Sequence, residues 1–465
     1  MGEPTTTARG AITLVADDFT ELPFAEGPLA GDGPIGWPGY ADAHARAAAR
    51  SGETESVVCG TGVVGAVPVV LVSFEFGFLG GSLGERTGAR IAVAHAVARE
   101  RRLPVVVLPA TGGSRMHEGM RALLQLQYLA GESELTRAAG LPQIAVLRDP
   151  TTGGGWATLG AGSDVVLALP GAQVGFAGSR VRPPDADPAA YTAEAQFAHG
   201  HVDAVVAPAE LRAVLGRWLS LLTGPVGDGP VRPPDALATP GAAPDGAPGA
   251  AVPHATGGRE AVARARHPGR PRADDYLDAH FTVRSEIWGD RCGGVDPGVR
   301  CGFGRLPDGR TVAYAAQCGT ATRPAGFRTA ARLVRLAGRL GIPVLTLIDT
   351  PGAANDEAAE HAGAGPAIAD LFAAVVSART PLTSLLIGEG GSGGALALAA
   401  PGNLWATPDS YFSVIAPELA ASILKRPPEE SAEVADRLRL SPGDLLDLGV
   451  VRGVVEAGRA DGSAP

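Results

Sequence analysis

The feature that most constrains the fold of this chain is an internal repeat at one constant spacing. Pro104 and Pro343, each followed by an apolar run, lie 239 positions apart (343 − 104). The same spacing relates residues 149–155 to residues 388–394, and no gap is needed from residue 104 to residue 177. Chance does not hold one spacing across strands, turns and helices. We therefore predict that the two halves are copies of one unit.

Each copy is predicted to alternate buried strands with helices. Apolar residues recur at helical spacing over 84–102 and 327–340, where a proline follows each pattern. Continuous apolar strands at 105–108 and 344–348 indicate burial on both faces of a sheet. This combination is typical of an α/β fold.

A segment rich in Pro, Gly and Ala separates the two copies, at residues 223–258. It is dense in Pro, Gly, Ala and Asp and cannot make a core of its own, so we expect a linker or disordered tether there. A chain of 465 residues is also too long for a single core. We therefore expect a first domain at residues 1–222 and a second at residues 259–465.

Five of the seven residues in 388–394 are glycine, between the apolar runs 382–386 and 396–400. We interpret this as a strand, a turn and the start of a buried helix. Without Cβ atoms, backbone N–H groups in the turn can approach a ligand and face a developing negative charge. The alternative is that the glycines only allow the helix to pack closely on the strand.

Three enzyme motifs can be tried on this turn, and none of them fits. Residues 390–394 match the nucleophile-elbow pattern G-x-S-x-G, but no histidine follows His361 to complete a hydrolase triad. Residues 388–393 match the dinucleotide pattern G-x-G-x-x-G, with Asp409 downstream, but that pattern should open its domain. A phosphate-binding loop is excluded because G-K-[ST] is missing.

Composition narrows the class of protein further. A hydrophobic content of 45%, with 19% charged residues, is typical of a soluble globular protein, and the net charge of −10 argues against a nucleic-acid binder. The four cysteines show no C-x-x-C spacing, so we expect no metal site. The sequence shows no membrane-spanning run, and we expect a cytoplasmic protein.

Long motifs in both halves resemble the carboxyltransferase of bacterial acetyl-CoA carboxylase. The first half resembles its β subunit in FLGGSLGE (78–85), ATGGSRMHEG (110–119), DPTTGG (149–154) and GFAG (175–178). The second half resembles its α subunit in ARHPGRP (265–271), GFR (326–328), DTPGA (349–353), GEGGSGGA (388–395) and SVIAPE (413–418).

The resemblance implies a fused β–α carboxyltransferase with two tandem crotonase-like domains of the ClpP/crotonase superfamily, built from β-β-α spiral repeats. It implies transfer of a carboxyl group from carboxybiotin to the α-carbon of an acyl-CoA such as acetyl-CoA. The first half would bind the acyl-CoA and the second half the carboxybiotin, with the two substrates meeting between protomers of a dimer or hexamer. A biotin carboxyl carrier protein and a biotin carboxylase would be its partners.

The resemblance also implies the site residues. Gly112 and Gly113 correspond to the hole for the thioester enolate, and Gly394 and Ala395 to the hole for the biotin anion. Further substrate-binding residues are expected at Gly81, Ser82, Arg86, Arg115, Met116, Gly153, Gly154, Phe176, Gly178, Gly352 and Gly393. For Arg86 and Arg115 we expect contacts with phosphate or thioester, with surface ion pairing as the alternative.

Three departures from the family pattern accompany the resemblance. The first half holds only Cys59, so the four-cysteine zinc ribbon of many β subunits is missing. The loop 360–366 keeps one acid and one glycine of the usual α-subunit segment. The single lysine, Lys425, is in no Met-Lys-Met motif, so biotin must be carried in trans.

Two alternative functions stay open at this point. One is a decarboxylase of malonyl or other acyl thioesters with the same fold. The other is a non-catalytic assembly paralogue.

Overall fold

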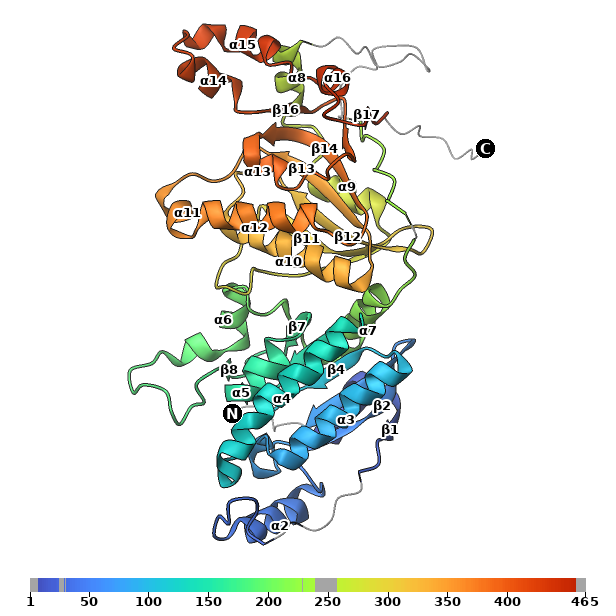
Figure 1. The fold of residues 1–465 in the computed structure, drawn as a ribbon, viewed down its shortest axis with the longest axis vertical. Coiled ribbons are helices and arrows are strands. Elements are labelled where there is room, and N and C mark those ends of the chain that lie inside the picture. The colour runs from blue at the N-terminus through green and yellow to red at the C-terminus, as the bar shows by residue number, and fades with distance from the viewer. Residues whose placement is uncertain (1–6, 25–28, 30, 228, 239–256, 457–465) are drawn as a thin grey trace. The chain divides into compact units, whose positions relative to one another are not determined.

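The computed structural model describes residues 7–24, 29, 31–227, 229–238 and 257–456 (Figure 1). The chain divides into two compact units. The first is bounded as Met1–Gly224 with Arg291–Gly293, and the second as Pro225–Asp290 with Gly294–Pro465.

The first unit is built on a seven-stranded sheet in the order β1-β2-β3-β4-β5-β7-β9. The first three strands pair antiparallel and the others parallel, while β6 and β8 form a separate parallel pair. The strands are β1 (Asp17–Glu21), β2 (Val57–Val64), β3 (Val67–Phe74), β4 (Val105–Leu108), β5 (Gln143–Leu147), β6 (Thr151–Thr152), β7 (Val165–Ala168), β8 (Val174–Gly175) and β9 (Ala204–Val205).

Helices α1, α3 and α7 pack on β2 and β3, and α4 lies beside α3 (Figure 1). The helices are α1 (Ala8–Val15), α2 (Tyr40–Ser51), α3 (Glu85–Arg101), α4 (Gly119–Ala138), α5 (Gly153–Gly155), α6 (Ala193–Ala198) and α7 (Pro208–Leu222). Short 3₁₀-helices are η1 (Leu79–Gly81), η2 (Met116–Glu118) and η4 (Pro188–Tyr191), and η3 (Trp156–Gly160) is a short π-helix.

The second unit repeats the plan with an eight-stranded sheet in the order β10-β11-β12-β13-β14-β15-β17, where β16 pairs with β14. Strands β10 to β12 are antiparallel and the later ones parallel. The strands are β10 (Val283–Glu286), β11 (Val299–Arg305), β12 (Thr311–Gln317), β13 (Val344–Thr350), β14 (Leu382–Gly391), β15 (Leu404–Ala406), β16 (Tyr411–Ser413) and β17 (Gly453–Val454).

In the second unit α10 and α12 lie side by side against the sheet (Figure 1). The helices are α8 (Gly258–Ala265), α9 (Ala273–His280), α10 (Pro324–Leu340), α11 (Glu357–His361), α12 (Ala364–Val376), α13 (Ser392–Leu396), α14 (Pro417–Ile423), α15 (Ser431–Arg437) and α16 (Pro442–Asp447), with the turn η5 at Pro428–Glu430.

The predicted α/β fold and its internal repeat are confirmed. Helices α3 and α10 begin 239 positions apart (324 − 85), and so do β4 and β13 (344 − 105). Both of these strands are fully buried, as their continuous apolar runs predict. The helix ends also correspond, because Arg102 and Gly341 both close their helices in the left-handed conformation.

Two expectations from the sequence are corrected. The segment 223–258 is not only a linker, because Val231 and Ala236 are buried in the core of the second unit and the Thr383 hydroxyl donates to Val231 O (2.7 Å). Residues 239–256 of the expected linker lie outside the described residues. The run 396–400 does not start a helix, because α13 begins earlier, at Ser392, and ends at Leu396.

Candidate active site

In the first unit, the turns that follow β4 and β5 meet. Thr111 forms a bridge with Thr151, and the N–H of Thr152 donates to Thr111 O (2.9 Å). Gly153 has a φ of +61°, and a Cβ on it would lie 3.2 Å from Gly113 Cα. The backbones of the two turns are therefore in close contact, and glycine permits that contact.

The second unit brings together the two equivalent turns, 350–353 and 391–394. A Cβ on Gly391 would clash with Pro351 O, and a Cβ on Gly394 would clash with Ala353 N. Each unit thus builds one site from two glycine-containing turns at matching points of the repeat.

The first turn of each unit is held by a hydrogen bond of its own. The N–H of Gly113 donates to Thr111 Oγ1 (3.0 Å), and the N–H of Gly352 donates to Thr350 Oγ1 (3.1 Å). The N–H of Gly112 donates to Gly80 O (2.9 Å). Both N–H groups therefore already have an acceptor within the fold, and a substrate oxygen at Gly112 and Gly113 would share these donors. Their assignment to the site stays a prediction.

The glycines of 388–394 divide into packing glycines and one open glycine. Added Cβ atoms at Gly388, Gly390, Gly391 and Gly394 would meet other atoms within 3 Å, whereas Gly393 has nothing within 4 Å. Gly394 and Ala395 are both buried. The packing alternative therefore holds for four of these glycines, and Gly393 is the one that faces open space.

The other expected substrate residues lie at several depths around the first site. Gly81 is buried and takes a φ of +61°, where a Cβ would clash with Ala110 O. Met116 and Phe176 are exposed at 75% and 73%. Half-buried positions are Ser82, Arg86, Gly153 and Gly178, while Gly154 is buried. These residues remain predicted contacts.

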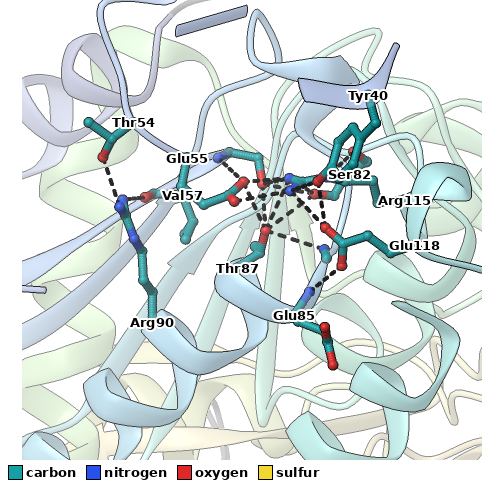
Figure 2. Close-up of polar contacts among 12 residues, drawn as sticks. Tyr40, Thr54, Glu55, Val57, Ser82, Glu85, Thr87, Arg90, Arg115 and Glu118 are labelled. Carbon is teal, nitrogen blue, oxygen red and sulfur yellow. Dashed lines mark hydrogen bonds and ion pairs between the residues drawn. The ribbon is translucent and has the colours of Figure 1, made fainter. Parts of the chain in front are cut away.

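Arg115 is corrected most strongly, because it is neither a surface residue nor free to bind a phosphate. Its side chain is 1% exposed and forms an ion pair with Glu55, which is fully buried. It also donates to Ser82 O (2.8 Å), Tyr40 OH (3.2 Å) and Glu118 Oε1 (3.3 Å) (Figure 2). Every described contact of this guanidinium is with the protein itself.

The charges in this network hold each other in the ionised state. Burial by itself favours a neutral Glu55 carboxyl, yet the guanidinium of Arg115 keeps the pKa of Glu55 below its ordinary value. Burial likewise opposes the charge of Arg115, but Glu55 raises the pKa of Arg115. Tyr40 donates its hydroxyl to Glu118 (2.6 Å), and burial raises the pKa of Tyr40.

The motif search missed a second buried ion pair, which lies beneath the turn of the second unit. Arg270 Nη2 contacts Asp349 Oδ1 at 2.6 Å, with both side chains almost fully buried. The N–H of Glu389 donates to the same Asp349 oxygen (3.1 Å). The signal available in the sequence was that each of these residues lies inside a motif, Arg270 in ARHPGRP (265–271) and Asp349 in DTPGA (349–353).

Acidic groups beside the turns are paired. Glu389 accepts hydrogen bonds from Arg266 (2.8 Å) and from the Tyr411 hydroxyl (2.8 Å). Burial, together with the negative charge of Glu389, raises the pKa of Tyr411. Within the described residues, no three His, Cys, Asp or Glu side chains gather in a way that could hold a metal. None of the described helices has the length and apolar character that crossing a membrane requires.

Two solved structures share the fold of this chain. The chain is similar to transcarboxylase 12S, with a TM-score of 0.73 at 21% identity over 97% of this chain and 86% of that one. It is similar, too, to a single-chain, multi-domain long-chain acyl-CoA carboxylase, with a TM-score of 0.71 at 20% identity over 97% of this chain and 44% of that one. These likenesses show the crotonase-like fold.

Family models match both halves of the chain. Residues 38–202 match the carboxyl transferase domain, and residues 257–462 match the acetyl co-enzyme A carboxylase carboxyltransferase-like family. The protein is therefore a carboxyltransferase with two crotonase-like units.

Its relatives narrow the class further. The chain is 39% identical over 440 residues to the acetyl-coenzyme A carboxylase carboxyl transferase subunits beta/alpha of Saccharopolyspora erythraea, covering 90% of this chain and 74% of the relative. It is 35% identical to a probable biotin-dependent acyl-coenzyme A carboxylase beta3 subunit of Mycobacterium bovis, covering 90% and 83%. The chain belongs to the acetyl-coenzyme A carboxylase carboxyl transferase beta/alpha family.

Proposed function

We propose that this carboxyltransferase moves a carboxyl group between carboxybiotin, held on a separate carrier protein, and the α-carbon of a short acyl-CoA such as acetyl-CoA. Family membership supports the reaction type. The only lysine, Lys425, follows Leu424 and precedes Arg426, which is not a biotinylation context. The carrier is therefore a partner protein, and a biotin carboxylase that loads it is a second partner.

The observation that carries the proposal is the equivalence of the two sites. Thr111 with Gly113, and Thr350 with Gly352, form the same hydrogen bond in the two units. A transfer between two substrates that each develop an oxyanion needs two such backbone sites rather than one catalytic side chain. The pairing of nearby side chains, such as Glu389 and Glu118, in ion pairs or hydrogen bonds is consistent with this assignment.

We assign the acyl-CoA to the first unit. There the thioester oxygen would face the backbone of Gly112, Gly113, Gly153 and Gly154. The N–H groups of the first residues of a helix lack an intrahelical acceptor, and Gly154 lies at the start of α5. Its N–H also has no acceptor outside this helix among the described residues, so it is a donor that a thioester oxygen could use. The exposed Met116 and Phe176 could contact apolar parts of the same substrate.

We assign biotin to the second unit, where the residues present fit its flat ureido ring. Gly393 leaves open space in front of the backbone, so a ring can approach closely. Gly394 and Ala395 lie in the first turn of α13, where their N–H groups would face the biotin anion, and Gly352 lies in the adjoining turn. Carboxybiotin supplies the carboxyl group when it is bound, and the chain binds the ring, orients it and stabilises negative charge with backbone N–H groups.

We also propose that the protein works as a homo-oligomer, either a dimer or a hexamer. Helix α4 exposes a row of large apolar side chains at helical spacing. Contact of such a row with water is unfavourable, and such faces often mark an interface with another protein. These side chains are Met120, Leu123, Leu124, Tyr128 and Leu135. A second copy of the chain would cover such a face.

Reverse transfer tests the proposal. Malonyl-CoA is incubated with the purified chain and a biotinylated carrier, and acetyl-CoA is measured. We expect product only with the carrier, and none after avidin is added. Product without any carrier would instead indicate the acyl-thioester decarboxylase. Binding of carrier without turnover would indicate the assembly paralogue.

A further inference from the structure

A buried arginine–carboxylate pair lies beneath each of the two proposed substrate sites. In the first unit the pair is Arg115 with Glu55, and in the second it is Arg270 with Asp349. The side chains of both pairs are at most 1% exposed. None of them reaches the solvent-facing side of a turn, so none can touch a substrate directly.

In the first unit, the pair ties the loop after η1 to the Gly112–Gly113 turn. Arg115 N–H donates to Leu83 O (2.8 Å), and Leu83 N–H donates to Gly113 O (2.9 Å). The Arg115 side chain then donates to Ser82 O (2.8 Å) and Ser82 Oγ (3.1 Å). Glu55, two residues before β2, accepts from the guanidinium (3.0 Å) and holds it in place (Figure 2).

In the second unit, the pair ties the segment before α9 to both turns. Arg270 donates to Ile387 O (3.3 Å), in the middle of β14. Asp349 accepts the N–H of Glu389 with its carboxylate and the N–H of Gly319 with its backbone oxygen (2.7 Å). Gly388 leaves the room that this pair occupies, because a Cβ there would clash with Arg270 and Asp349.

The two pairs are not copies of each other. The repeat places Ala354 opposite Arg115 and Ala110 opposite Asp349 (115 + 239, 349 − 239). Each unit therefore has a buried arginine–carboxylate pair beneath its turns, but the residues of the two pairs occupy positions that are not equivalent in the repeat. A change to one pair has no counterpart in the other unit.

Net stability does not explain why these charges are buried. The desolvation of a buried ion pair offsets most of its attraction, and well-packed apolar residues often replace such pairs without loss. What a guanidinium adds is a planar fork with five donors at fixed angles, which apolar packing cannot supply. Six residues accept hydrogen bonds from the Arg115 side chain: Tyr40, Glu55, Ser56, Ser82, Thr87 and Glu118.

We propose that Arg115 with Glu55 positions the acyl-CoA site and that Arg270 with Asp349 positions the biotin site, each acting through the backbone of its own turn. This inference rests on the proposed function, which assigns one substrate to each unit. They are positioning residues, since they reach the substrates only through Ser82, Leu83 and Glu389.

The test replaces each arginine with lysine, which keeps the charge but removes the fork. In Arg115→Lys we expect the KM for acyl-CoA to rise about tenfold or more, with the KM for biotinylated carrier unchanged. Arg270→Lys should show the reverse pattern. A general loss of folding would affect both substrates together, so opposite patterns identify positioning.

Arg99→Lys is the matched control, because Arg99 pairs with Glu132 between α3 and α4 (2.6 Å) and contacts neither turn. It should lower the melting temperature at most and leave both KM values unchanged. If either arginine variant fails to fold, Glu55→Gln or Asp349→Asn takes its place in the test. Each of these variants keeps the shape of the acceptor side chain and removes its charge. Equal effects on both substrates, or no effect on either, would overturn the inference.

Failure of the proposed function would look different. In that case the unmodified protein transfers no carboxyl group, and equilibrium binding of acetyl-CoA and of biotinylated carrier is measured instead. A selective loss of acetyl-CoA binding in Arg115→Lys, and of carrier binding in Arg270→Lys, would still support the positioning roles. Unchanged binding of both would overturn them.

Discussion

Ser392 takes the same left-handed backbone conformation as Gly153, its counterpart in the repeat. Their φ angles are +56° and +61°. Both open the short helix that follows the second turn of their unit. Glycine adopts this conformation freely, whereas an L-residue is strained in it by about 1–2 kcal/mol. Ser392 is exposed, and its hydroxyl has no hydrogen-bond partner within the described part of the chain.

The two positions should therefore respond oppositely to exchange. Ser392→Gly relieves backbone strain, and we expect the free energy of unfolding to stay within about 0.5 kcal/mol of its original value or to rise. Gly153→Ser introduces strain beside Gly113 and should destabilise by about 1 kcal/mol or more. Urea unfolding of both variants measures the difference. A clear loss of stability in Ser392→Gly would show that its side chain has a structural contact.

Gly393 and Gly394 separate an effect on the site from an effect on folding. Gly393→Ala meets open space, so the protein should keep its melting temperature, while transfer falls by about 10²-fold because the added methyl group holds the ring away from the backbone. Gly394→Ala would push a methyl group into Ala353 N and should lower the melting temperature. Full transfer by a folded Gly393→Ala protein would remove this residue from the proposed site.

His95 should make the first unit sensitive to acid. It is buried and contacts Thr136 Oγ1 (2.9 Å), and burial, with Arg99 nearby, lowers the pKa of His95 to about 4. The unfolded chain binds the proton near pH 6.5, so stability is complete above that pH and is lost as the pH falls toward 4. Between pH 6.5 and pH 5 the loss should be about 2 kcal/mol.

Chemical unfolding at several pH values measures this loss, with His95→Gln as the comparison. The variant should lack most of the slope between pH 6.5 and pH 5. An unchanged slope would assign the acid sensitivity to other groups.

The segment before residue 239 should contribute to the stability of the second unit. Val231 is buried in that core, whereas Val226 is partly exposed. Val231→Ala should therefore destabilise by about 1–2 kcal/mol through loss of buried apolar surface. Val226→Ala is the matched control and should change stability by less than about 0.5 kcal/mol. Equal effects would mean that the segment does not pack in solution as it does in the structure.

Local sequence patterns predicted the backbone well because periodicity and glycine placement act over short distances. The apolar spacing over 84–102 located α3 to within a residue at each end, whereas the pattern over 327–340 found the end of α10 but began three residues after its start at Pro324. The prediction that a buried helix starts at 396–400 was wrong, because small apolar residues also fill buried turns. The packing of Val231 was missed because its neighbours are Pro and Asp, which indicate a linker.

Side-chain partnerships were harder to predict. Arg115 and Glu55 are 60 residues apart, and no repeat or spacing rule links them. The resemblance indicated that Arg115 belongs to the site but not that it lies beneath the turn. Which glycines face a ligand also depends on tertiary neighbours, such as Phe412 beside Gly390.

The most direct test of the central claim is the forward reaction with labelled bicarbonate. The purified chain is combined with acetyl-CoA, ATP, a biotin carboxylase and a biotinylated carrier, and acid-stable label in malonyl-CoA is counted. We expect labelled product only when all components are present, and none after avidin is added. Labelled product without the carrier would contradict the account, as would its absence from a complete system in which the chain binds both acetyl-CoA and carrier.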